Sequence, residues 1–157
     1  MVENPTKVLT VVYPQRMRCL PTACGILGRF CSANQTEVHE YNALWDTGAD
    51  GSVISNSVVT QLGLIADGKI RVYHADGMSL VNTYTVDLRL PSGVTFRNLV
   101  VTSGDLMDTD IIIGMDVISM GDFAITAPGG ETKFSFQVPS SHDIDFNVLR
   151  AEEVKYA

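Results

Sequence analysis

The chain has 157 residues, of which 45% are hydrophobic, and a formal charge of −7 at neutral pH. This length is most simply one domain with its own core, and the acidic balance argues against a nucleic-acid binder or a protein of anionic membrane surfaces. No apolar stretch is long enough to cross a membrane, and the first residues lack the apolar region of a signal peptide. We therefore expect a cytoplasmic protein with no nucleic-acid or membrane partner.

Strand-like segments separated by turn residues run along most of the chain. An apolar run at 24–31 and a strand at 37–45, joined by polar turn residues, predict a hairpin. The run 110–114 is too short for a helix and predicts a strand buried on both faces. Further strands are predicted at 8–13, 69–74, 79–90, 94–102, 122–126 and 132–138. Turn signals recur about every ten residues, which indicates an all-β barrel or sandwich.

Short helices are expected at two places in this pattern. Polar N-cap residues at 55–57 precede 58–62, and Gly63 is a natural stop. Residues 115–120 predict a single helical turn.

The predicted strand at 79–90 ends in strict alternation. Val86 and Leu88 fall on one face, and Asp87 and Arg89 on the other. This period of two predicts one buried face and one face in water.

The three cysteines, Cys19, Cys24 and Cys31, all lie in the first third of the chain. An odd number at uneven spacing fits reduced thiols better than a disulfide framework. A zinc site would need a fourth ligand, for which His39 is the nearest histidine, but no Cys-x-x-Cys pair supports one. We expect no metal and no cofactor.

The most informative stretch is Trp45-Asp46-Thr47-Gly48-Ala49-Asp50, a polar turn between two apolar runs. A carboxylate in this setting should lie deep, where desolvation opposes its charged form. Gly48 permits a tight turn or the close approach of a second chain, and the Thr47 hydroxyl can bond across such an approach. Taken alone, the tripeptide Asp-Thr-Gly is weak evidence for a site, and its default interpretation is an Asx turn completed by glycine.

Three segments together resemble the retropepsin-like aspartic proteases. Residues 43–50 look like the active-site loop of that family, and 111–118 are similar to its second signature, an apolar strand that ends in glycine and leads into a short helix. Residues 72–79 stand where the family places its flap, the hairpin that closes over substrate. The order and spacing agree across 37–123. The extension beyond 123 resembles that of non-viral cellular members.

The resemblance implies a retropepsin-like acid-protease β-barrel with one or two short helices and an active site at a homodimer interface. The protease domain is expected at 1–140, with a catalytic core at about 20–126 and a C-terminal hairpin that ends at 138. A tail at 141–157 follows and is compatible with a short helix.

Paired carboxylates are the chemical reason for the dimer. Two like charges a few ångströms apart cannot both ionise, so the pair shares one proton. The chain has one Asp-Thr-Gly, and Asp108-Thr109-Asp110 lacks the glycine of a second copy. An enzyme of this type must therefore combine two copies across a two-fold axis.

The resemblance also implies roles for individual residues. Asp46 is the catalytic carboxylate, and Thr47 and Gly48 support its loop. Ile112 lines the pocket at the scissile bond or is plain core, Asp50 contacts substrate or is a surface carboxylate, and His74 is a substrate contact or an idle surface residue. The expected substrate-binding residues are Ala49, Asp50, His74, Ala75, Asp76, Gly77, Met78 and Ile112.

One departure from the family concerns charge. Many retroviral members carry arginine after the second-signature glycine, where it pairs with the acid of the catalytic loop, but here Met115 follows Gly114. Asp50 therefore lacks its local cation, for which Arg16 or Arg18 of the partner subunit would substitute.

Two functions from different classes remain open. The first is a homodimeric aspartic endopeptidase that cuts extended polypeptides; the second is a catalytically silent dimeric module of the same fold that acts as a peptide-binding or scaffold domain. An unrelated β-barrel with a chance turn is a third interpretation. In the predicted strand 132–138, Phe134 and Phe136 share one face. We expect the dimer interface to bury them, the alternative being the subunit's own core.

Overall fold

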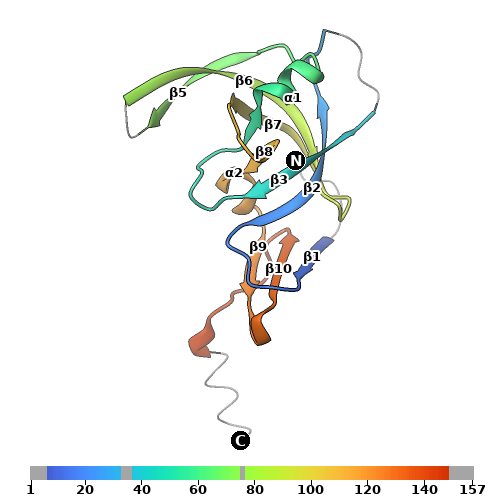
Figure 1. Cartoon of the computed structure of the whole chain (residues 1–157), viewed down its shortest axis with the longest axis vertical. Coiled ribbons are helices and arrows are strands. Elements are labelled where there is room, and N and C mark those ends of the chain that lie inside the picture. Colours follow the sequence, from blue (N-terminus) through green and yellow to red (C-terminus); the bar gives the residue numbers. More distant parts are fainter. Residues whose placement is uncertain (1–6, 33–36, 75–76, 149–157) are drawn as a thin grey trace, which may run out of the picture.

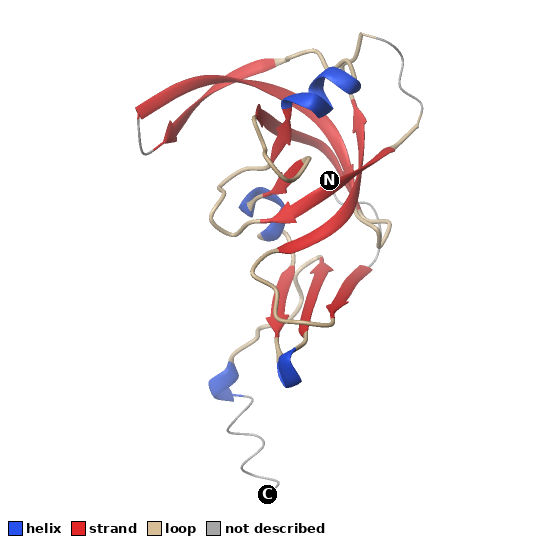
Figure 2. Cartoon of the chain, viewed as in Figure 1, coloured by secondary structure: helices blue, strands red, loops and turns tan. Residues whose placement is uncertain are grey.

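The computed structural model describes residues 7–32, 37–74 and 77–148. Within these ranges the chain is mostly strands, with a few short helices between them and a helical segment at 146–148 (Figures 1 and 2). The strands are β1 (Lys7–Tyr13), β2 (Leu20–Gly28), β3 (His39–Trp45), β4 (Val53–Ser55), β5 (Gly68–His74), β6 (Gly77–Arg89), β7 (Thr95–Gly104), β8 (Ile111–Ile113), β9 (Asp122–Thr126) and β10 (Thr132–Val138). The helical elements are α1 (Asn56–Gln61), α2 (Met115–Ile118) and η1 (Pro128–Gly130). The all-β prediction is confirmed.

The larger sheet closes on itself. Its strand order is β2-β3-β8-β4-β7-β6-β5, and β2 also pairs with β6. Six strands therefore form a ring, in which side chains that point inward fill a small barrel. The predicted hairpin of the second and third strands is confirmed, because β2 and β3 pair antiparallel from Leu20↔Trp45 to Ile26↔His39.

β5 stands outside this ring. It pairs antiparallel with the first half of β6, whereas the second half of β6 pairs with β2. The β5–β6 hairpin therefore projects from the barrel as a separate two-stranded arm (Figure 1). This arm is the segment that sequence reasoning assigned to the flap.

β8 is one of the six strands of the ring and lies between β3 and β4. It pairs in parallel with β3, through Ala43↔Ile111 and Trp45↔Ile113, and antiparallel with β4. Ile111 and Ile113 are fully buried and belong to the hydrophobic core. Ile112, which points to the other face, is half-buried. The expected burial on both faces is therefore met on one face and only partly on the other.

The predicted helix at 58–62 is confirmed as α1. The Ser55 hydroxyl accepts a hydrogen bond from the Val58 amide at 3.2 Å, and Ser55 is the N-cap. Gly63 has a φ of +56°, which is typical of the residue that ends a helix.

The alternation in β6 predicted the apolar face correctly but not the polar one. Val86 and Leu88 are buried, but Asp87 is also only 8% exposed. Its carboxylate oxygens lie 2.9 Å from Nε of Arg29 and 2.7 Å from one of its terminal nitrogens. The amide of Asn98 also donates to it at 3.0 Å. Asp87 is buried because a bidentate arginine and a backbone donor replace its water.

The smaller sheet has the order β1-β10-β9. β9 and β10 pair antiparallel, which confirms the predicted last hairpin. β10 also pairs with β1 on its other side. Phe134 and Phe136 are 0% and 1% exposed within the single chain. The expectation that a dimer interface buries them is wrong, because their rings fill the chain's own core.

The rest of the chain adds little to the site. In the tail expected at 141–157, residues 146–148 are helical, and the residues after 148 lie outside the described ranges. No helix in the described ranges has the length and apolar character needed to cross a membrane.

Candidate active site

The catalytic-loop candidate begins where β3 ends. The amide of Asp46 donates to the Ile113 carbonyl at 2.9 Å, so the parallel β3–β8 pairing extends one residue into the loop. The Asp46 Oδ1 atom accepts from the Gly48 amide at 2.8 Å. Ala49 donates to the Asp46 carbonyl at 3.3 Å. Asp46 thus lies in a tight Asx-type turn whose first residue is held by the sheet.

Asp46 is half-buried in the single chain, and Thr47 and Gly48 are exposed. The expectation of a deeply buried carboxylate is therefore not met by one chain alone. The turn points its side chains away from the barrel interior, so a second copy would be needed to desolvate them.

Gly114 fixes the second signature against the loop. A Cβ atom at this position would lie 2.6 Å from the carbonyl carbon of Gly51 and 2.9 Å from the carbonyl oxygen of Ala49. Only glycine leaves room for this close backbone approach. The approach lets the next two backbone amides bond to the loop: the Met115 amide donates to the Ala49 carbonyl at 2.8 Å, and the Asp116 amide donates to the Asp50 carbonyl at 3.2 Å.

Ser52 and Asp116 form a second connection between the same two segments. The Ser52 amide and hydroxyl donate to the Asp116 carboxylate at 2.9 and 2.7 Å. The Ser52 hydroxyl accepts from the Gly114 amide at 3.1 Å. Sequence reasoning missed this pair, although a buried serine beside an apolar strand needs a polar partner.

The base of the loop is aromatic. The Trp45 ring, one residue before Asp46, lies 5.0 Å from Phe134, 4.9 Å from Phe136 and 5.9 Å from Phe123 between centroids. Its Nε1 donates to the Thr22 hydroxyl at 2.9 Å. The smaller sheet therefore supports the catalytic loop directly, and its packing fixes the position from which Asp46 projects.

A pocket of about 430 Å³ lies between this loop and the β5–β6 arm. Its walls combine the loop, the arm and the β6–β7 surface. The lining residues are Gly48, Ala49, Asp50, Gly51, Ser52, Val53, Ile70, Arg71, Val72, Tyr73, Thr83, Val100 and Thr102. A cleft with apolar walls and few charged groups suits an extended peptide.

The predicted substrate contacts are only partly brought together. Ala49 and Asp50 line the pocket, whereas Ile112 does not. Gly77 and Met78 are exposed at the end of the arm, where Gly77 pairs with His74 and has a φ of +134°. Ala75 and Asp76 lie outside the described residues, and the Ile112 side chain is only half-buried.

The charge of Asp50 is not paired in the single chain. In the described ranges no cation forms an ion pair with its carboxylate, although Arg71 lines the same pocket. Arg16 and Arg18 are exposed in the segment after β1. They remain the candidates from a partner subunit.

The cysteines take no part in this site. Burial raises the pKa of the Cys24 thiol to about 12, so it remains protonated. Cys19 is exposed and Cys31 half-buried, and all three are free thiols. Within the described residues no group of three or more His, Cys, Asp and Glu side chains is arranged to hold a metal ion.

These features define the retropepsin-like class of aspartic protease folds: a closed barrel, an Asp-Thr-Gly loop on a parallel strand pair, a glycine-limited second signature and a projecting hairpin. The family model described as gag-polyprotein putative aspartyl protease matches residues 34–120. The chain therefore belongs to that family.

A solved structure agrees with the fold. A retropepsin-like aspartic protease from Rickettsia conorii aligns over 88% of this chain and 99% of its own, with 12% identity and a TM-score of 0.51. The simian foamy virus (mac) protease aligns over 64% of this chain and 92% of its own, with 12% identity and a TM-score of 0.44. No curated protein matches the sequence.

Proposed function

We propose that the chain is an aspartic endopeptidase that hydrolyses peptide bonds in extended polypeptides as a homodimer. The observation that carries the proposal is the Asp46 turn, which the Ile113 carbonyl holds and whose residues Gly48 and Ala49 line a pocket that Asp46 itself does not line. One chain supplies one such carboxylate. Two copies would supply the pair that the reaction needs.

The chemistry then follows from one shared proton. One Asp46 carboxylate takes a proton from a water molecule, whose oxygen attacks the scissile carbonyl carbon. The other Asp46, which is protonated, gives its proton to the carbonyl oxygen. When the tetrahedral intermediate collapses, the carbon–nitrogen bond breaks and the amine leaves with a proton from the pair.

The neighbouring residues take supporting roles in this proposal. The Thr47 hydroxyl bonds the opposite loop, and Gly48 lets the substrate backbone come close. Ala49 and Asp50 bind substrate backbone from the loop. The β5–β6 arm closes over the peptide, with Gly77 at its tip and His74, Ala75, Asp76 and Met78 beside it. Ile112 of β8 contacts the substrate only if the Asp46 loop shifts when the substrate binds.

The pocket walls suggest the kind of peptide. Val53 from the loop side, Ile70 and Val72 from β5 and Val100 from β7 present apolar side chains to one space. Burial of a substrate leucine or phenylalanine there contributes about 1.5–3 kcal/mol. We expect cleavage next to apolar side chains.

The test compares Asp46→Asn with the wild-type protein on an unfolded protein substrate, with cleavage read by mass spectrometry across acidic and neutral pH. Asp46→Asn should lose roughly 100-fold or more in rate without loss of folding. Asp108→Asn, which changes an exposed carboxylate in the 105–110 loop between β7 and β8, is the matched control and should cleave normally.

The wild-type rate should fall on both sides of an acidic optimum, because only the singly protonated pair is active. If Asp46→Asn cleaves as fast as the wild type, catalysis belongs to another group. If the wild type binds peptides but cleaves none, the silent peptide-binding module is the correct function.

A further inference from the structure

The pocket between the Asp46 loop and the β5–β6 arm contains two groups of opposite charge. Among the described residues that line it, only Asp50 and Arg71 are charged. Asp50 belongs to the loop, and Arg71 belongs to β5 of the arm. Every other lining residue is apolar, a glycine or a residue with a hydroxyl group. Asp50 and Arg71 therefore decide which charged side chains this pocket accepts.

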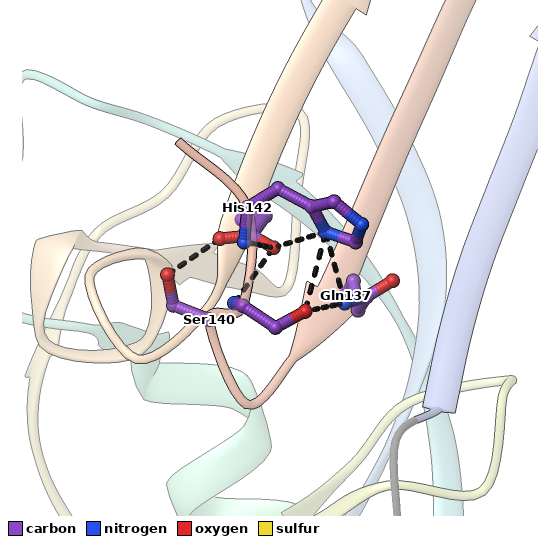
Figure 3. Close-up of polar contacts among 5 residues, drawn as sticks. Gln137, Ser140 and His142 are labelled. Carbon is purple, nitrogen blue, oxygen red and sulfur yellow. Dashed lines mark hydrogen bonds and ion pairs between the residues drawn. The ribbon is translucent and has the colours of Figure 1, made fainter. Parts of the chain in front are cut away.

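Arg71 is unpaired in the part of the chain that the structure describes. Its guanidinium forms neither an ion pair nor a hydrogen bond there. The Arg29–Asp87 ion pair lies outside the pocket. The same is true of the pair between His142, when it is protonated, and Asp122, in the polar cluster of Figure 3. A guanidinium has five N–H donors in a planar fork that matches a carboxylate, and at Arg71 this fork is available to a ligand.

The other charged groups of the proposed site are carboxylates. In the proposed dimer the Asp46 pair shares one proton and so keeps one negative charge. Asp50 adds a second negative charge, and the whole chain has a formal charge of −7. These groups repel a substrate carboxylate that enters the cleft unless a cation meets it. Arg71 is the cation that the pocket provides.

The strand pairing places Arg71 at a distance from the tip of the arm. His74 faces Gly77 at the tip, and Arg71 faces Leu80. Arg71 comes three residues before His74, and a strand advances about 3.3 Å per residue, so these two positions are about 10 Å apart. An extended peptide advances by the same amount per residue. With the tip over the scissile bond, Arg71 therefore lies beside the substrate residue about three positions away.

We propose that Arg71 binds an aspartate or glutamate side chain about three residues from the cleaved bond. The substrates are then peptides that are apolar at the point of cleavage and acidic farther along. The two-fold axis of the proposed dimer gives one such acidic subsite on each side of the bond. This inference rests on the proposed function, because it names the substrate class of the same pocket. In the competing arrangement, Arg71 pairs with Asp50 when the arm closes, and no acidic peptide is required.

The test uses a synthetic library of ten-residue peptides with apolar residues at the two central positions and varied residues elsewhere. The wild type should cleave peptides with glutamate three residues from the bond about tenfold faster than those with glutamine, because a charged hydrogen bond to Arg71 is lost with glutamine. Arg71→Glu should reverse this preference and favour lysine at the same position. Mass spectrometry of the products measures both ratios.

Lys69→Glu is the matched control. Lys69 is exposed on the same strand and does not line the pocket, and its replacement changes the net charge by the same amount. Lys69→Glu should keep the wild-type preference. If Lys69→Glu shifts the preference as far as Arg71→Glu does, the effect comes from the overall field of the chain, and the inference is overturned.

A second readout does not depend on cleavage. The same library is passed over immobilised Asp46→Asn protein, and the retained peptides are identified by mass spectrometry. Acidic peptides should be enriched about tenfold over their glutamine counterparts. The Asp46→Asn protein that also carries Arg71→Glu should retain lysine-containing peptides instead.

The outcomes separate the subsite from the proposed function. If peptides are cleaved without preference for acidic residues, or if Arg71→Glu slows the cleavage of all peptides alike, the inference is overturned and the proposed function stands. If no peptide is cleaved but Arg71 decides which peptides are retained, the acidic subsite stands and the proposed function fails. If peptides are neither cleaved nor retained, both are wrong.

Discussion

Replacing Gly114 by alanine tests whether the second signature fixes the catalytic loop. The alanine Cβ would lie 2.6 and 2.7 Å from the carbonyl carbon and oxygen of Gly51, and 2.9 Å from the carbonyl oxygen of Ala49. All three atoms belong to backbone, so no side chain can rotate to make room. The loop or β8 must move by several tenths of an ångström.

The size of the effect follows from what this movement disturbs. Overpacking of a dense interior typically costs about 1–3 kcal/mol. The same movement stretches the Met115–Ala49 hydrogen bond of 2.8 Å and the Ser52–Gly114 bond of 3.1 Å. We expect Gly114→Ala to lower the free energy of unfolding by about 2–3 kcal/mol. Peptide cleavage should fall by about 100-fold, because a small misplacement of the catalytic group is sufficient.

Urea unfolding and a peptide-cleavage assay measure the two effects. Gly104→Ala is the matched control, because its Cβ would meet only a Val53 methyl carbon at 3.8 Å. Gly104→Ala should leave the free energy of unfolding close to that of the wild type and the cleavage rate within a factor of a few. If Gly114→Ala behaves like Gly104→Ala in both assays, the loop is not held by this backbone contact and the reasoning is refuted.

Two further predictions concern the smaller sheet. Phe136→Ala should lower the free energy of unfolding by about 3–5 kcal/mol and leave the dissociation constant of the dimer unchanged. If the dimer weakens while the stability of the monomer is unchanged, the Phe136 ring belongs to the dimer interface and not to the core. Hydrogen bonds from Ser140 first, then Ser141 and His142, hold the pKa of Asp122 below its usual range. These hydrogen bonds should therefore stabilise the folded chain above about pH 4, which is near the pKa of an aspartate in the unfolded chain. This stabilisation should be lost as the pH falls through the lower pKa of Asp122 in the folded chain. Hydrogen exchange of the Ser141 and His142 amides should then be slow at pH 6 in the wild type and fast in Asp122→Asn; equal rates would contradict the contact.

Local features of this fold were readable from the sequence because they depend on neighbours in the chain. Ser55 caps α1 through its own side chain, and Val86 and Leu88 of β6 are buried as the apolar alternation of the sequence predicts. The Asp-Thr-Gly turn and the glycine-ended strand could be paired only by resemblance. Their contact joins Asp46 to Ile113, and such a long-range pairing leaves no local signal.

The errors have the same origin. Asp87 occupies the polar phase of its strand, yet it is buried because Arg29, 58 residues earlier in the chain, reaches it. Phe134 and Phe136 form an apolar face, but a pattern does not say what covers that face. Trp45 covers it here. The predicted deep burial of Asp46 is not found in the single chain, where its side chain is half-buried; under the proposed function a second copy would cover it.

The central claim is that each active site needs two Asp46 residues, one from each chain. Wild-type protein and Asp46→Asn are mixed at fixed total concentration, allowed to exchange subunits, and assayed for peptide cleavage. Because only dimers with two Asp46 are active, the rate should follow the square of the wild-type fraction, so an equal mixture should retain about one quarter of the wild-type rate. A rate that falls in proportion to the wild-type fraction, to about one half in the equal mixture, would show that each chain works alone and would contradict the account.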